Sequence, residues 1–152
     1  MTVSIDLASA GQTIIVVLFG ICIVAIAVML WKKVLGFFRG RAFDGTDREN
    51  MRRRWVEIEK AMETPGEMGK KLAIIEADKL LDTALKSLSM AGETLGERLK
   101  FAQYKYPELR DVWPAHRVRN QLAHEASYHL DTGTARRSLK QFRSALERLG
   151  AL

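Results

Sequence analysis

The chain has 152 residues, with 24 Lys and Arg against 18 Asp and Glu, and therefore a net charge of +6 at pH 7. This length suits one domain, and the single cysteine, Cys22, excludes a disulfide framework and a cysteine metal site. The basic balance favours anionic partners, which are either lipid headgroups or nucleic acid.

The N-terminal part contains an uncharged apolar run of 18 residues, IIVVLFGICIVAIAVMLW, at positions 14–31. As a helix this run reaches roughly 27 Å, which is enough to cross a thin bilayer core. A cleaved signal peptide is the alternative, and it needs a positively charged start. The only charged side chain before the run is Asp6, and the run continues into WKKVLGFFRGR. We therefore expect a transmembrane helix over residues 14–31.

The distribution of basic residues around this run predicts its orientation. No Lys or Arg precedes the run, whereas Lys32, Lys33, Arg39 and Arg41 follow it closely. Positive charge stays on the cytoplasmic side, so the sequence predicts a single-pass protein of the cell membrane. Residues 1–13 are then a short extracytoplasmic tail, residues 32–45 a juxtamembrane linker, and residues 46–152 a cytoplasmic domain.

A second basic cluster lies close to the run and predicts contact with the membrane surface. It consists of Arg52, Arg53 and Arg54. Together with the four basic residues that directly follow the run, it is expected to meet the anionic headgroups of the bilayer.

Residues 46–152 have helical periodicity, and no stretch alternates like a strand. Apolar residues recur at steps of three and four, as in Met51, Trp55 and Ile58. Helix starts are predicted at three Thr-x-x-Glu capping boxes, at a proline and at a polar cluster. They lie at residues 46–49, 64–67, 94–97, 114 and 131–134. The pattern predicts an all-α fold, a bundle of four principal helices and a short one near residues 95–104.

The most polar of these helices begins in the stretch PAHRVRNQLAHE, residues 114–125. At about 100° per residue, Arg119 lies on the same side as the small and apolar residues Ala115, Leu122, Ala123 and Ala126. His116, Asn120 and His124 follow one another at steps of four along the adjoining flank. Arg119 is therefore expected to point toward the bundle rather than toward solvent.

An arginine on a packed face requires an anion. In LAIIEADKLLDTALKSL, Asp78 lies on the apolar side of the predicted helix, and Asp82 follows one turn later on the same edge. The sequence therefore predicts a structural ion pair between Asp78 and Arg119, with Asn120 and His124 bonded to neighbouring backbone. It shows no metal-ligand cluster and no cofactor motif, so neither a metal nor a cofactor is expected.

The stretch RNQLAH resembles the R-x4-6-H signature of the HEPN superfamily of small all-α domains, in which a polar residue, often Asn, directly follows the Arg. Here the signature falls on Arg119, Asn120 and His124. The resemblance implies metal-independent RNA cleavage, as in active members, and dimerisation that places two motifs in one cleft. Many similar domains instead act as partner-binding or scaffolding modules.

Two functions follow as expectations. The first is a membrane-tethered HEPN-like interaction module, self-associating and bound to an unidentified protein partner. The alternative is a membrane-tethered ribonuclease in which Arg119, Asn120 and His124 are catalytic and RNA is the substrate. A histidine can move the protons of RNA cleavage, and an arginine can stabilise charge on the phosphate.

Overall fold

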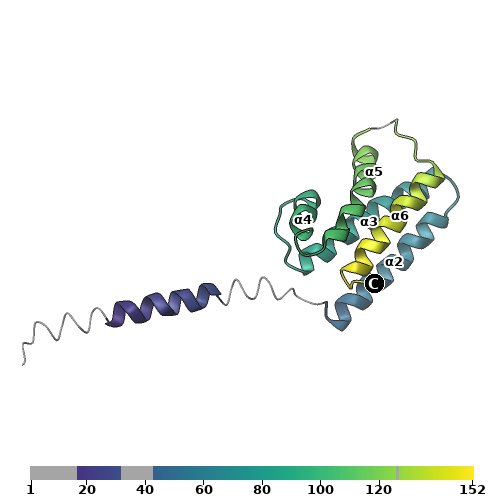
Figure 1. Cartoon of the computed structure of the whole chain (residues 1–152). Helices are drawn as coiled ribbons and strands as arrows, with labels where there is room; N and C mark the ends of the chain where they lie inside the picture. Colours follow the sequence, from purple (N-terminus) through teal and green to yellow (C-terminus); the bar gives the residue numbers. More distant parts are fainter. Residues whose placement is uncertain (1–16, 32–42, 126) are drawn as a thin grey trace, which may run out of the picture. The chain divides into compact units, whose positions relative to one another are not determined.

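The structure is a computed structural model that describes residues 17–31, 43–125 and 127–152 (Figure 1). The chain divides into two compact units, Met1–Gly40 and Arg41–Leu152, and each is described by itself. All regular secondary structure in the described ranges is helical. The predicted all-α class is therefore confirmed.

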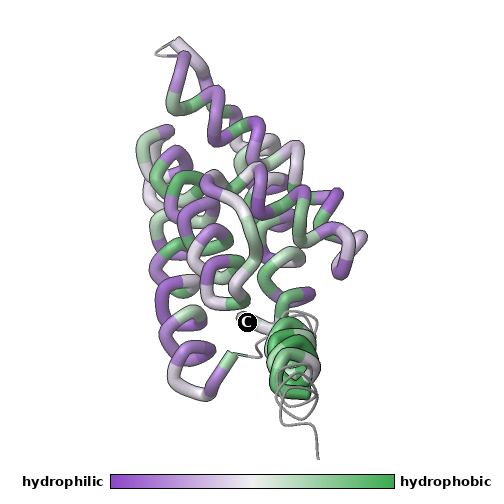
Figure 2. The backbone as a smooth tube through the Cα atoms, turned by 90° about the vertical axis from the view of Figure 1, so that its left-hand side faces the viewer, coloured by the Kyte–Doolittle hydropathy of each residue, from purple (hydrophilic) through white to green (hydrophobic). Residues whose placement is uncertain are grey.

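In the first unit, residues 17–31 form a helix whose side chains are all exposed, for example Phe19 and Trp31. Figure 2 shows this helix nearly end-on, in the green of hydrophobic residues. Among the residues that the structure describes, no helix is both long and apolar enough to cross a membrane. The tail at 1–13, the start of the predicted span at 14–16, and the linker cations Lys32, Lys33, Arg39 and Arg41 lie outside the described residues.

The second unit is a bundle of five α-helices and one 3₁₀ helix. These are α2 (Gly45–Glu63), α3 (Glu67–Ser87), α4 (Leu95–Ala102), η1 (Pro107–Val112), α5 (Trp113–His124) and α6 (Thr132–Arg148). Each of the α-helices of this unit alternates between hydrophobic and hydrophilic residues (Figure 2). Residues on their apolar stripes form one core, with Phe142, Ile74 and Leu109 among its largest fully buried side chains.

Helix α3 is the centre of this bundle. It packs against α2, α4, α5 and α6, and it buries residues around much of its circumference, including Ala73, Ile74, Ala77, Asp78 and Leu81. Because several neighbours surround α3, a polar side chain on its buried faces has little access to water. Asp78 is only 4% exposed, so it depends on partners from the surrounding helices.

The predicted helix starts were partly correct. Thr94 caps α4 through a hydrogen bond from the Glu97 backbone N–H, and Asp131 caps α6. The box at 46–49 was wrong, because α2 begins earlier with Asp44 as its N-cap. The box at 64–67 was also wrong, since the left-handed backbone of Gly66, with φ 94°, delays the start of α3.

Helix α4 is attached to α3 by a buried arginine. Arg98 donates to the Asp82 carboxylate at 2.8 Å and to the backbone carbonyls of Gly92 and Glu93. Lys86 also contacts Asp82, at 2.7 Å. Burial alone would raise the pKa of Asp82, but the hydrogen bonds from Arg98 and Lys86 outweigh it and hold this pKa below its usual value. The Arg98 side chain thus holds α4 against α3 and also holds the loop that connects the two helices.

Glu67 has a different role from the predicted capping box, because it holds the loop between α5 and α6. Its carboxylate accepts from the Leu130 backbone N–H at 2.9 Å, and lies 2.9 Å from Lys71 and 3.1 Å from His129. The backbone hydrogen bond from Leu130, followed by those from Lys71 and His129, lowers the pKa of Glu67 to about 2. The ionised form is therefore favoured in the folded protein.

We predict that Glu67→Gln lowers the melting temperature at neutral pH, because it removes the charge that these three donors share. A carboxyl whose folded pKa is depressed contributes stability above its unfolded pKa, near 4.5, and loses it as the pH falls toward about 2. The difference in melting temperature between wild type and variant should therefore shrink as the pH falls through that window. Glu63→Gln, at an exposed site, is the matched control. An equal effect of both substitutions at pH 7 would contradict this role.

Candidate functional site

The motif helix α5 begins directly after η1, with Pro114 in its first turn. Its buried residues are Ala115, His116 and Val118, all in the first half of the helix. In the second half Leu122 is only half-buried and Ala123 is exposed. The small-residue face predicted from the sequence therefore packs only at its start; Ala126 is outside the described residues.

The carboxylate of Asp78 connects α3 with α5. Its Oδ2 lies 3.1 Å from Nε of Arg119, so the ion pair expected from the helical angles is present. Its Oδ1 lies 2.7 Å from Nδ1 of His116. The Arg119 side chain is 32% exposed, whereas those of Asp78 and His116 are 5% and 11% exposed. A buried carboxylate with two donors on adjacent turns of one helix fixes that helix in both rotation and axial position.

Asn120 closes these contacts into a ring. Its Oδ1 accepts from Nη1 of Arg119 at 3.2 Å, and its amide nitrogen lies 3.2 Å from Nε2 of His116. Because the amide oxygen of Asn120 accepts from Arg119, its NH₂ group faces Nε2 of His116 and donates to it. Nε2 is then the acceptor of the imidazole, so we assign the ring proton to Nδ1, which donates to Asp78. We call Asp78, His116, Arg119 and Asn120 the polar ring; each member contacts two others.

His116 is the member of the polar ring that the sequence-based reasoning missed. It was placed with Asn120 and His124 on a flank, but its side chain is buried and packs edge-on against Trp113, with ring centroids 5.9 Å apart. The spacing that reveals it is i, i+3 to Arg119, since two donors at that spacing reach one acceptor on a facing helix. Gly96 of α4 lies beside the imidazole of His116, since a Cβ added to this glycine would be 3.8 Å from Nε2 of His116.

His124 does not join the polar ring. It is the last residue of α5 and is exposed. Together with Asn120 and Gln121 it lines a shallow depression of about 530 Å³, to which Arg119 does not contribute. The structure therefore brings Arg119 and Asn120 together, but it does not bring His124 to the same contact.

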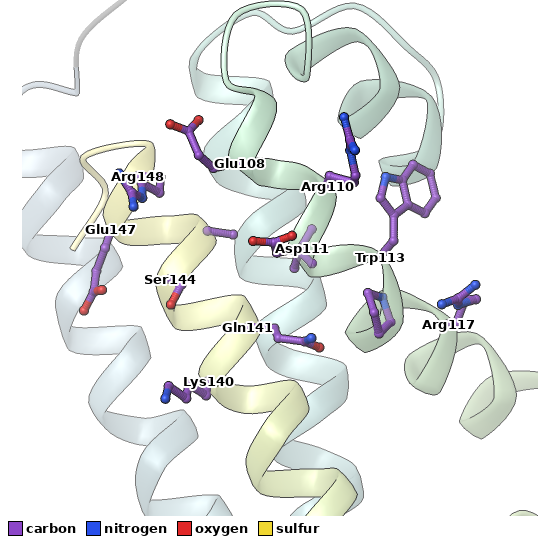
Figure 3. A pocket seen from close by; sticks show the side chains of 13 residues that line it. Glu108, Arg110, Asp111, Trp113, Arg117, Lys140, Gln141, Ser144, Glu147 and Arg148 are labelled. Carbon is purple, nitrogen blue, oxygen red and sulfur yellow. The ribbon is translucent and has the colours of Figure 1, made fainter.

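A larger groove of about 980 Å³ lies between η1, the start of α5 and α6 (Figure 3). Apolar atoms of Val112, Pro114 and Ala145 contribute to it, as do carboxylates from Glu108 and Asp111. Four basic residues also line it: Arg110, Arg117, Lys140 and Arg148. Pro114 and Arg117 line both this groove and the shallow depression, so the two are adjacent along α5.

The cluster Arg52, Arg53 and Arg54 is exposed on α2. Three consecutive residues of a helix spread over about 200° of its circumference, so they cannot all face one plane. Arg53 also donates to Asn50 at 2.7 Å. In the described ranges, no group of three or more His, Cys, Asp and Glu residues is arranged to hold a metal ion.

The chain matches no protein-family model, no curated protein and no solved structure. The resemblance to the HEPN superfamily therefore rests on the motif residues and on the helical architecture alone.

We predict that Asp78→Ala destabilises the protein by about 3–5 kcal/mol, because it leaves the His116 and Arg119 donors without their shared acceptor. Arg119→Ala should cost less, roughly 1–2 kcal/mol, since Asp78 retains His116 and the guanidinium is one-third exposed. The neighbouring exposed Arg117→Ala is the control and should change the free energy of unfolding by at most about 0.5 kcal/mol. Urea denaturation measures all three. If Asp78→Ala is no worse than Arg117→Ala, the polar ring is not structural.

Proposed function

We propose that this protein is a membrane-tethered, HEPN-like helical interaction module in which the RN-x3-H helix organises the bundle. The observation that carries the proposal is the use of Arg119. Its Nε is engaged by Asp78 and its Nη1 by Asn120. An arginine that stabilises charge on a phosphate must direct its N–H groups at that phosphate. Here two of the three guanidinium nitrogens are directed into the protein.

The tether is supported by the chemistry of residues 17–31. They form a helix without a charged residue, and its large side chains are exposed on all sides, Met29 by 67% and Val24 by 62%. A helix that is apolar around its whole circumference requires an apolar environment. Residues 14–16 extend the uncharged run to 18 residues. In the proposal, the hydrocarbon core of a bilayer is the apolar environment of this run.

The HEPN-like character is supported by the order of the elements. The motif lies on a late helix of an all-α bundle, and that helix packs against the central helix α3. The resemblance to the HEPN superfamily implies dimerisation, so the proposal includes self-association. A closed two-fold interface is the simplest way to achieve it.

A ribonuclease is the second candidate, and one observation favours it. Asn120 and His124 line the same depression beside Arg117, and the His124 side chain is open to solvent. In this alternative His124 moves the proton of the 2′-hydroxyl or of the leaving oxygen, and Arg119 stabilises the phosphate. Arg119 would first have to leave one of its contacts with Asp78 and Asn120.

We predict that the purified full chain in detergent does not cleave single-stranded RNA in the presence of EDTA above a buffer control. His124→Ala is the informative variant, because His124 lies outside the polar ring and its replacement should not affect folding. Cleavage by the wild type that falls roughly 10²–10⁴-fold in His124→Ala, with an unchanged melt, would establish the ribonuclease instead. His129→Ala, at another exposed histidine, is the matched control.

We predict that membranes containing the chain retain it after alkaline carbonate extraction, and that a cysteine placed after residue 43 is labelled only after the membrane is opened. Labelling of that cysteine from outside intact cells would reverse the predicted orientation. Release of the chain by carbonate would show that residues 14–31 are not a span. Cys22→Ser supplies the background without a second thiol.

A further inference from the structure

The charges of the bundle are distributed unequally between its helices. The exposed lysines Lys60, Lys79 and Lys86 of α2 and α3 are each paired with a carboxylate of their own helix. The exposed arginines at 52–54 of α2 form no ion pair among the described residues, but they spread over about 200° of that helix. On α6 the exposed cations Arg136, Arg137, Lys140 and Arg148 form no ion pair among the described residues. The acidic residue of α6, Glu147, is bound to Arg143.

The unpaired cations continue from α6 across the neighbouring groove. Arg110 of η1 and Arg117 of α5 line its other side and are exposed (Figure 3). Neither forms an ion pair within the described part of the bundle. The four unpaired cations that line this groove, together with Arg137 on the exposed side of α6, constitute what we call the basic face: Arg110, Arg117, Arg137, Lys140 and Arg148. Arg136 is not part of it, because it lines a different pocket beside Glu59 and Glu63.

We propose that the basic face docks the bundle onto an anionic lipid surface, with α6 lying along the headgroups. The proposal rests on the proposed tether. Helix α6 has a continuous apolar side buried in the core, at Ala135, Phe142 and Leu146, so only its basic side is available to a partner. Each Lys or Arg held near an anionic leaflet contributes attraction that acts within a Debye length of about 8–10 Å.

The length of the chain between the two units permits this contact. Thirteen residues separate residue 31 from Gly45, and they span at most about 45 Å when extended. Helix α6, with 17 residues, is about 26 Å long. A tether of that length keeps the basic face at a high effective concentration near the bilayer, so individually weak contacts suffice.

A lipid surface explains the basic face better than a nucleic acid does. A phosphate backbone that followed the groove would pass the carboxylates of Glu108 and Asp111, which line it between the cations. Proteins that bind single-stranded nucleic acid also typically present exposed aromatic rings on which bases stack. The aromatic residue that lines the groove, Trp113, is half-buried and packs against His116.

The test uses the full chain in nanodiscs of phosphatidylcholine, with or without phosphatidylserine, that contain a lipid with a quencher on its headgroup. A fluorophore is attached at Ser144→Cys, on the exposed side of α6, in the Cys22→Ser background. We expect strong quenching only with phosphatidylserine, and its loss at about 1 M salt, where the Debye length is about 3 Å. A label at Met68→Cys, exposed on α3, should show no such dependence.

The variant that tests the face itself replaces three cations of α6 by glutamine, at Arg137, Lys140 and Arg148. Each cation contributes roughly fivefold to the affinity for the anionic surface, so the loss of three should weaken docking about 100-fold. The matched control removes the same charge from ion-paired positions, at Lys60, Lys79 and Lys86, and should leave quenching unchanged. Equal quenching in both lipid compositions, or equal effects of the two triple variants, would overturn the proposal.

Two further outcomes separate this proposal from its alternatives. The first outcome is that the chain in phosphatidylcholine discs binds a labelled oligouridylate in a salt-sensitive way, and that the α6 variant weakens this binding. If phosphatidylserine also causes no quenching of the Ser144→Cys label, the basic face would be assigned to nucleic acid. Release of the chain by alkaline carbonate would refute the tether alone. The released chain should then still sediment with phosphatidylserine vesicles and not with phosphatidylcholine vesicles, and failure to do so would refute the docking surface as well.

Discussion

The carboxylate of Asp78 is almost fully buried on the central helix α3, and the rest of the motif is arranged around it. A buried charge is costly unless donors from the protein replace the lost water. His116 and Arg119 are those donors, and Asn120 contacts Nε2 of His116 and Nη1 of Arg119. Since all three come from α5, the requirement of one carboxylate sets the position of that whole helix against α3.

This constraint also separates the two halves of the motif. Arg119 and Asn120 are held in the polar ring, whereas His124, at the end of α5, is exposed. The first half of the helix is therefore structural, and the second half is free to meet solvent or a partner. This division supports the proposed interaction module over the alternative of a catalytic centre, in which arginine and histidine must act on one phosphate.

The helical bundle of the second unit was largely predictable from the sequence, because apolar periodicity and turn chemistry are local. The helices appear where steps of three and four predict them, and the pair of Asp78 with Arg119 followed from helical angles alone. The role of His116 was missed: its i, i+3 spacing to Arg119 permits a shared acceptor, but the contact also depends on how far α5 is rotated against α3. The prediction for Glu67 was wrong for a similar reason. Its spacing to Thr64 fits a capping box, but its carboxylate accepts a hydrogen bond from the backbone of Leu130, 63 residues away. The charge asymmetry of α6 is a tertiary property, because it depends on which lysines and arginines find a carboxylate.

The polar ring is a fixed structural element of the folded protein, and the protonation of His116 reports on it. The most direct measurement is the ¹⁵N NMR spectrum of histidine side chains in the full chain, with His116 assigned by comparison with His116→Gln. We expect one tautomer for His116, with its proton on Nδ1, bound to Asp78 and slow to exchange with water. A proton on Nε2, or rapid averaging between the two tautomers as expected for exposed His124, would contradict it.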